Sequence, residues 1–228
     1  MAVFFASWSL CGSRCRNAFW YSRNYQSSTS CSNPRLSMIV WTLTQLDQAS
    51  AVLRAGGVIA YPTESVFGLG CDPRSADAVS RIFQLKQRDP DKGFLLIGAN
   101  EDQFSDFVDW SQLTTSQQML VRSSWPGPYT WVFPASKHVP KHVVGKHEGL
   151  AVRVTAHEIA AELCRSFGGA LVSTSANLHG QAAALSVNEV LQQFSGSFLD
   201  GVIDADLGGL ARPSEIRNAL TGTTIRAS

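Results

Sequence analysis

Residues 86–93 (KQRDPDKG) combine side chains that bind phosphate groups well. Lys86, Arg88 and Lys92 lie within seven residues of one another. The planar fork of an Arg beside the point charge of a Lys suits the oxygens of a polyphosphate. The same cations follow a helical pattern, so complementing a helix C-terminus is the alternative interpretation. This cluster predicts a phosphate clamp.

A second polar cluster is the run STSAN, residues 173–177, directly after the apolar residues 170–172. Hydroxyl and amide groups just past a buried strand are costly unless they are hydrogen-bonded. If strand geometry continues, alternation directs Ser173, Ser175 and Asn177 to one side. We expect these three side chains to bind a ligand together, with helix capping as the alternative.

A third cluster follows the apolar run that ends at Tyr61. Thr63 lies in the segment YPTES, and the glycines of the next segment, residues 67–70 (FGLG), would let backbone approach a ligand closely. A tight turn with incidental hydroxyls is the alternative.

Two smaller sites lie elsewhere in the chain. Arg153 stands in an apolar segment and therefore needs an anionic partner, for which a ligand carboxylate is a candidate. Ser214 follows Arg-Pro near the C-terminus.

Common catalytic motifs are missing from the sequence. There is no phosphate-binding GxxxxGK[ST] loop and no GxSxG elbow, and Pro73 stands where the dinucleotide fingerprint needs Gly. The five His residues show no ligand spacing and are interpreted as solvated or structural: His138, His142, His147, His157 and His179. If the protein is an enzyme, we expect it to work without a protein nucleophile or a tightly held metal.

The elements that must position these clusters alternate between helical and strand periodicity. Helices are predicted at 43–55, at 75–86 and at 117–122, the last preceded by Thr115 with Gln118 three residues on. Capping boxes at 155–158 and 186–189 are predicted to open two more helices, the first of which runs to Arg165. Strands are predicted at 58–61, 94–97, 129–133, 150–154, 170–172, 202–203 and 223–225. This alternation favours one α/β domain over residues 38–228.

The composition is that of an ordinary globular protein. The chain has 228 residues, 44% of them hydrophobic and 16% charged, which excludes a wholly disordered chain. The formal net charge of +1 is too small to indicate a nucleic-acid partner by itself. No window approaches a membrane-spanning apolar run, so we expect no membrane partner.

Residues 1–37 differ from the remainder in charge. They contain four Arg, nine Ser and no acidic residue, whereas residues 38–228 hold 15 basic and 18 acidic side chains, a net of −3. This pattern fits a mitochondrial or plastid transit peptide, an upstream start codon with Met38 as the true initiator, or a structural arm. We expect a disordered arm at 1–37, and a cytoplasmic location unless the segment is a genuine targeting signal.

Six blocks closely resemble the YrdC/TsaC family in its short, single-domain form: GGVIAYPTESVFGLGCDP, LKQRDPDKGFLLI, WPGPYTWVFP, LAVRVT, LVSTSANLHG and RPSEIRNAL. Their order and spacing match, and they cover nearly all of 38–228. The family's K-x-R and S-x-N pairs are present as Lys86/Arg88 and Ser175/Asn177. The resemblance implies a twisted mixed α/β sheet flanked by helices around a concave basic cavity.

The resemblance also implies an activity. ATP, L-threonine and bicarbonate would give L-threonylcarbamoyladenylate and pyrophosphate, and other proteins would transfer the threonylcarbamoyl group to tRNA, forming N6-threonylcarbamoyladenosine (t6A). The implied catalytic residues are Lys86 and Arg88. The implied ATP ligands are Arg88, Lys92, Ser175, Asn177 and Arg226, and the implied threonine ligands are Thr63, Arg153, Ser173 and Ser214. Mg²⁺ is expected to arrive with ATP, without a dedicated protein site.

Two positions depart from the family's longer form, and three rival functions stay open. Lys92 replaces a usual Asn, and Ile97 lies near the place of a His that contacts threonine. The main rival is an RNA-binding module that uses the same basic cavity, with weak RNA binding. The net charge of −3 over 38–228 speaks against it. The second rival is the carbamoyl-transferring domain of hydrogenase maturation proteins, which would be accompanied by acylphosphatase and zinc-finger modules in the same chain. The third is a structural protein.

Overall fold

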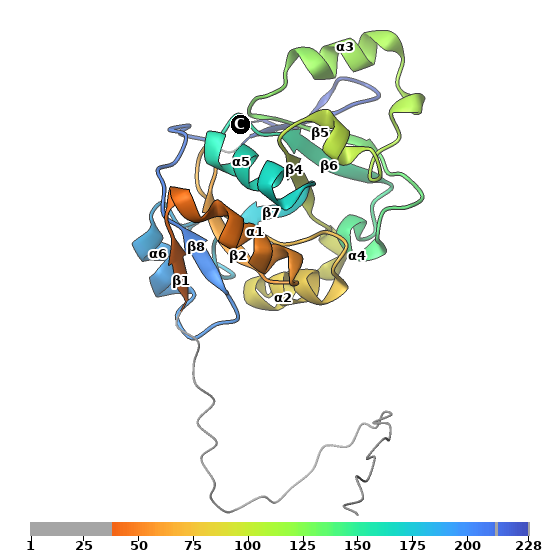
Figure 1. Cartoon of the computed structure of the whole chain (residues 1–228). Helices are drawn as coiled ribbons and strands as arrows, with labels where there is room; N and C mark the ends of the chain where they lie inside the picture. Colours follow the sequence, from red (N-terminus) through yellow and green to blue (C-terminus); the bar gives the residue numbers. More distant parts are fainter. Residues whose placement is uncertain (1–37, 213, 228) are drawn as a thin grey trace, which may run out of the picture. The chain divides into compact units, whose positions relative to one another are not determined.

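The computed structural model describes residues 38–212 and 214–227, and within them the chain forms one ten-stranded sheet (Figure 1). The strands are β1 (Ile39–Trp41), β2 (Ile59–Pro62), β3 (Phe67–Gly70), β4 (Leu95–Gly98), β5 (Tyr129–Pro134), β6 (Gly149–Val154), β7 (Leu171–Ser175), β8 (Gly201–Ile203), β9 (Glu215–Asn218) and β10 (Thr224–Arg226). The α-helices are α1 (Leu46–Arg54), α2 (Ala76–Lys86), α3 (Thr115–Ser123), α4 (Lys141–Val144), α5 (Glu158–Phe167) and α6 (Val187–Gln193). The prediction of a disordered arm at 1–37 lies outside the described residues.

The sheet is mixed, with the strand order β1-β8-β2-β3-β7-β4-β6-β5-β9-β10. Strand β8 pairs in parallel with β1 and β2, β4 pairs in parallel with β6, and β5 with β9. The other neighbours are antiparallel. The expected α/β fold with a twisted mixed sheet and flanking helices is therefore confirmed.

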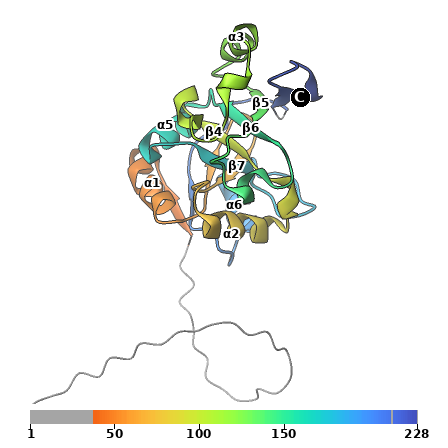
Figure 2. The ribbon, with the colours of Figure 1, turned by 90° about the vertical axis from the view of Figure 1, so that its right-hand side faces the viewer.

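Alternation along the strands divides the core between the two faces of the sheet. Ile59, Ile97 and Leu171 belong to a cluster that includes buried residues of α1 and α5. Their neighbours Leu96 and Val172 belong to the other cluster, which includes residues of α2 and α6. Figures 1 and 2 show α1 and α5 side by side on one face of the sheet. Because side chains alternate, the face that carries Leu171 also carries Ser173 and Ser175 farther along β7.

Two helix starts differ from the sequence-based prediction. The capping box expected at 155–158 is wrong, because α5 is capped by His157, whose Nδ1 accepts from the backbone N–H of Ala160. The Thr155 hydroxyl donates instead to the carboxylate of Glu64. A true capping box opens α3 with Thr114, one residue earlier than expected.

The segment 67–70, for which no strand was predicted, is strand β3 between β2 and β7. Its glycines make room for neighbours: a Cβ on Gly70 would lie 2.6 Å from Cε1 of Tyr61, and one on Gly68 would lie 3.2 Å from Cγ2 of Thr63. Strands β1 and β9 and the short helix α4 were not anticipated either. Over 38–212 and 214–227, none of the helices has the length and apolarity needed to cross a bilayer.

Candidate functional site

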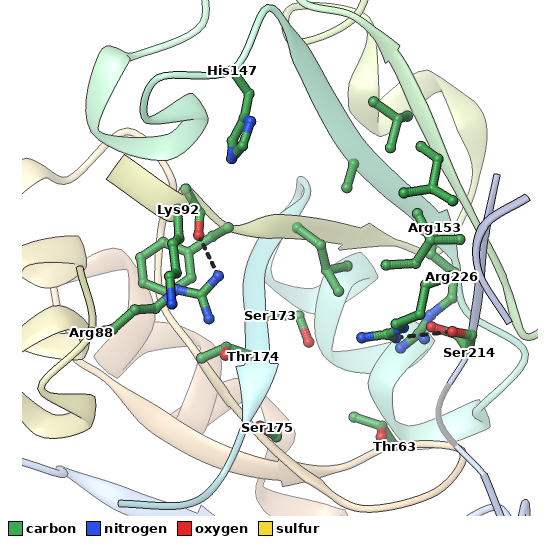
Figure 3. A pocket seen from close by; sticks show the side chains of 18 of the residues that line it. Thr63, Arg88, Lys92, His147, Arg153, Ser173, Thr174, Ser175, Ser214 and Arg226 are labelled. Carbon is green, nitrogen blue, oxygen red and sulfur yellow. Dashed lines mark hydrogen bonds between the residues drawn. The ribbon is translucent and has the colours of Figure 1, made fainter. Parts of the chain in front are cut away.

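A cavity of about 720 Å³ opens on the sheet and gathers most of the predicted site residues (Figure 3). The predicted residues in its wall are Thr63, Arg88, Lys92, Arg153, Ser173, Ser175, Ser214 and Arg226. Lys86 and Asn177 line a smaller pocket of about 310 Å³, whose wall also includes Arg88, Lys92 and Ser175. The two hollows therefore adjoin, and all ten predicted residues border one or the other.

One end of the cavity is cationic and is built from the chain that follows α2. Gln87 adopts a left-handed conformation (φ 46°), which ends the helix and turns the chain. Arg88 then donates through Nη2 to the carbonyl oxygen of Gly93 (3.0 Å), and its guanidinium carbon lies 5.3 Å from the centroid of the Phe94 ring. Figure 3 shows Lys92 beside Arg88.

Arg88 keeps donor capacity for a ligand. Its Nε is buried and has no hydrogen-bond partner among the described residues. Burial lowers the pKa of Arg88, and the nearby Asp89 partly offsets this effect. A desolvated cation with an unused donor at a cavity wall is suited to a phosphate oxygen.

Lys86 faces the S-x-N segment instead of the larger cavity. Its ammonium lies 2.6 Å from the backbone oxygen of Ser175, 3.0 Å from the backbone oxygen of Asn177 and 2.8 Å from Asn177 Oδ1. A lysine has three donors, so these acceptors occupy all of them. Burial, together with the neighbouring charge of Arg88, lowers the pKa of Lys86 to about 8. In this arrangement Lys86 holds the turn after β7 in place, and its catalytic role stays a prediction.

The S-x-N segment leaves strand geometry after Ser175, where β7 ends. Ser173 and Ser175 line the larger cavity, whereas Asn177 lines the adjoining pocket. Ser175 Oγ donates to Asn177 Oδ1 over 2.7 Å, which couples the two residues across the turn. The expected alignment of all three side chains is thus met for the two serines only.

The opposite end of the cavity carries the predicted threonine ligands. Arg226 donates through Nη2 to the backbone oxygen of Ser214 (2.9 Å), and the Ser214 hydroxyl lies 3.1 Å from that of Thr130. Figure 3 shows Arg153 beside Arg226, and Ser173 between this end and Arg88. Arg226, which the resemblance assigns to the nucleotide, therefore lies with the threonine group and not with Arg88.

Arg153 has a protein partner that was not singled out from the sequence. Its Nη2 lies 3.1 Å from Oε2 of Glu64, and both side chains are buried. The expectation that this Arg needs an anion is met within the chain. The signal was present, because a carboxylate in the buried segment YPTES needs a cation as much as Arg153 needs an anion.

His147 also lines the cavity, and Figure 3 shows its ring directed into it. The interpretation of this His as merely solvated or structural missed this placement. The backbone N–H of Lys146 donates to the carbonyl oxygen of Asp91 (3.0 Å), which fixes the loop beside the cationic end. By contrast, Ile97 is buried in the core beneath α5. No spacing in the sequence signals the approach of these two loops.

The wall of the larger cavity combines apolar side chains with charged ones, most of which are basic. Four basic side chains, Arg88, Lys92, Arg153 and Arg226, share the wall with one acid, Glu148. The apolar lining includes Phe94, Leu95, Val132, Ile216 and Ile225. Over the described ranges, no group of three His, Cys, Asp or Glu could hold a metal ion. The cavity can therefore receive an anionic molecule with an apolar part.

Comparisons with known proteins show which family this chain is similar to. The Sua5/YciO/YrdC family model, described as "Telomere recombination", matches residues 51–228. The protein named "Threonylcarbamoyl-AMP synthase" from Xanthomonas campestris pv. campestris (strain B100) is 48% identical over 181 residues, covering 79% of this chain and 96% of that protein. The protein of the same name from Stenotrophomonas maltophilia (strain K279a) is also 48% identical, over 182 residues, covering 80% of this chain and 97% of that protein.

Solved structures of similar proteins were also found. The structure of P. abyssi Sua5 complexed with L-threonine has a TM-score of 0.73 and 29% identity, covering 79% of this chain and 54% of that one. E. coli YciO has a TM-score of 0.72 with 23% identity, covering 82% of this chain and 93% of that one, and supports the fold alone. With the family model matching 178 residues, from 51 to 228, and relatives at 48% identity, the chain belongs to the Sua5/YciO/YrdC family.

Proposed function

We propose that the protein is a threonylcarbamoyl-AMP synthase, which converts ATP, L-threonine and bicarbonate into threonylcarbamoyl-AMP and pyrophosphate for the t6A modification of tRNA. The observation that carries this proposal is the single cavity with Arg88 and Lys92 at one end, Arg153 at the other and Ser173 between them (Figure 3). Relatives of this name align over almost their full length.

The reaction needs no covalent bond to the protein. The threonine nitrogen attacks CO₂ derived from bicarbonate, loses a proton and becomes a carbamate. A carbamate oxygen then attacks the α-phosphorus of ATP, and pyrophosphate leaves with the electrons of the broken P–O bond. The chemical obstacle is charge, since a carbamate, a carboxylate and a triphosphate must meet. Preorganised cations and hydrogen-bond donors lower that barrier.

The positions of the side chains suggest how the substrates lie. Arg88 and Lys92 would bind phosphate oxygens, and Arg153 would bind the threonine carboxylate at the other end. The hydroxyls of Ser173 and Ser175, on β7, lie between these groups, where carbamate and α-phosphate would meet. Loss of one donor aimed at developing charge typically raises a barrier by about 2.7–4 kcal/mol.

Mg²⁺ is proposed to enter as part of the ATP complex. Glu148 is the acid among the described residues of the cavity wall, and no group of three His, Cys, Asp or Glu is found among the described residues. Phosphate oxygens and water are the ligands that Mg²⁺ usually takes with nucleotides. We also propose that separate transfer proteins receive the product, and the cytoplasmic or organellar location stays a prediction.

The RNA-binding alternative is not favoured by the comparisons. An RNA module would show binding that weakens steeply with salt, without exchange between ATP and pyrophosphate. Both quantities can be measured on the same sample, so the two functions give opposite results.

The direct test is pyrophosphate release by the purified chain. We expect release only when ATP, threonine and bicarbonate are all present, because the nucleophile is the carbamate made from the last two. Omission of any one of them is the control. Release that is independent of threonine or of bicarbonate would contradict the proposal.

A further inference from the structure

Glu64 and Arg153 form a buried ion pair beside the cavity. Glu64 Oε2 lies 3.1 Å from Arg153 Nη2, and the two side chains are only 8% and 9% exposed. Taking both charges out of water is costly, so such a pair adds little to stability unless its geometry is fixed and further hydrogen bonds are made. A role beyond stability therefore has to be sought in what the pair positions.

The carboxylate of Glu64 is itself held in place by the two residues that follow β6. Oε1 accepts from the hydroxyl of Thr155 (2.7 Å) and from the backbone N–H of Ala156 (3.2 Å). The backbone oxygen of Glu64 also accepts from the N–H of Leu210 (2.8 Å). One oxygen is thus fixed by two donors. The other, Oε2, is buried, makes no hydrogen bond among the described residues and lies within ion-pair distance of the guanidinium.

Arg153 lies in the cavity wall, whereas Glu64 does not belong to the described lining. The Nε of Arg153 is buried, and the described residues offer it no hydrogen-bond acceptor. A guanidinium binds a carboxylate best through two parallel N–H bonds, which requires its plane to be fixed. The charge of Glu64, 3.1 Å from Nη2, attracts the guanidinium and restricts where it can lie.

We propose that Glu64 is a positioning residue: it orients Arg153 so that the guanidinium binds the carboxylate of the amino-acid substrate. This inference rests on the proposed function. Glu64 does not touch the substrate. It makes the enzyme selective for amines that carry a neighbouring carboxylate.

The variant Glu64→Gln probes this role sharply. The backbone N–H of Ala156 can only donate, so the amide oxygen must stay at the place of Oε1. The amide nitrogen then faces Nη2 of Arg153 across the 3.1 Å contact, donor against donor. The guanidinium has to move, although the volume of the side chain is unchanged.

The experiment measures kcat/KM for L-threonine and for L-threoninol, which has the amine but lacks the carboxylate. We expect the wild type to prefer threonine, and Glu64→Gln to lose about tenfold or more of that preference with the KM for ATP unchanged. The matched control is Glu101→Gln, which removes a carboxylate from the more exposed pair with Arg122 and should keep the preference.

A second variant guards against a folding defect in Glu64→Gln. Thr155→Val removes the hydroxyl that holds Oε1 and keeps the β-branched shape, so we expect a smaller loss of the same preference. If either folded variant loses activity equally on both substrates, or if both keep the wild-type preference, the inference is overturned. If the wild type itself forms no threonylcarbamoyl-AMP, the proposed function fails instead.

Discussion

Lys86 and Asn177 are joined by two hydrogen bonds, from the ammonium to the backbone oxygen and to Oδ1 of the Asn, at 3.0 Å and 2.8 Å. This contact links the K-x-R and S-x-N pairs. Lys86 holds the turn after β7, and Arg88, two residues on, lines the cavity. The two cations of one short motif are therefore placed differently: Lys86 is bonded to the turn after β7, whereas Arg88 faces the cavity.

The first prediction concerns pH. Burial and Arg88 lower the pKa of Lys86 to about 8. Above that pH the neutral amine has only two hydrogens for three acceptors, so the turn at Ser175 and Asn177 loses its anchor. We expect affinity for a non-hydrolysable ATP analogue to fall as the pH rises through about 8, measured by titration calorimetry without threonine or bicarbonate.

The lowered pKa of Lys86 has the opposite effect on the stability of the fold, which should increase with pH instead of decreasing. An unfolded lysine has a pKa of about 10.4, so between that value and about 8 the unfolded state holds more protons. Its contribution therefore makes the free energy of unfolding rise with pH across this window.

The control for the binding experiment is Lys86→Arg, which stays charged, so its affinity for the ATP analogue should not change as the pH rises through about 8. A wild-type profile that is equally flat would contradict the role of Lys86.

The second prediction concerns Arg88→Ala. Removing the guanidinium deletes charge at the end of the cavity that we propose binds phosphate, and we expect kcat to fall by about 10²-fold or more. Arg88 is half-buried and, among the described residues, its side chain makes one hydrogen bond, with Gly93, so the fold should survive. Pyrophosphate release and the melting temperature measure the two effects. Unchanged turnover in a folded variant would remove Arg88 from the phosphate site.

The third prediction concerns Gly93, which has a φ of 54° between Lys92 and Phe94. A Cβ there would lie 2.5 Å from the backbone oxygen of Val144, so Gly93→Ala must displace the chain that presents Lys92. We expect a loss of stability of about 2–4 kcal/mol and a raised KM for ATP.

Gly168→Ala is the matched control for this effect. Gly168 also has a positive φ, of 88°, but an added Cβ would meet nothing within 4 Å. Its cost should be limited to backbone strain of about 1–2 kcal/mol, with an unchanged KM for ATP. Equal losses of stability and affinity in the two variants would show that the contact with Val144 has no special importance. Chemical denaturation gives both free energies.

The fourth prediction concerns residues 1–37. We propose that residues 38–228 carry the activity by themselves, because the ten predicted site residues lie within them and border the two described pockets. A chain that begins at Met38 should keep its turnover number and its melting temperature. A large drop in either quantity would show that the N-terminal segment supports the catalytic domain.

Much of the architecture follows from local pattern. The apolar runs that became β2, β4 and β7 and the periodicity of α2 identified an α/β domain. Local pattern did not predict the strand β3, because the glycines in this segment weaken its strand propensity. Its strand is fixed instead by pairing with β2 and β7 and by the close approach of Tyr61, which only the tertiary structure shows.

Site residues could be predicted where they belong to one short motif. They were harder to predict where loops from distant parts of the sequence bring them to the cavity. Lys86, Arg88 and Ser175 were found because their types and spacing are unusual. Glu64 was missed although a buried carboxylate, like the guanidinium of Arg153, needs a partner of opposite charge. His147 could not be found, because it reaches the cavity through a loop that is held by a backbone hydrogen bond to Asp91.

The central claim is that one cavity joins threonine, a carbon atom from bicarbonate and AMP without a covalent enzyme intermediate. The most direct measurement is mass spectrometry of the product after incubating the chain with ATP, threonine and ¹³C-labelled bicarbonate. We predict free threonylcarbamoyl-AMP that carries the label in its carbamoyl group, with pyrophosphate in equal amount. ATP turnover that yields no labelled adenylate, or label that stays bound to the protein, would contradict the account.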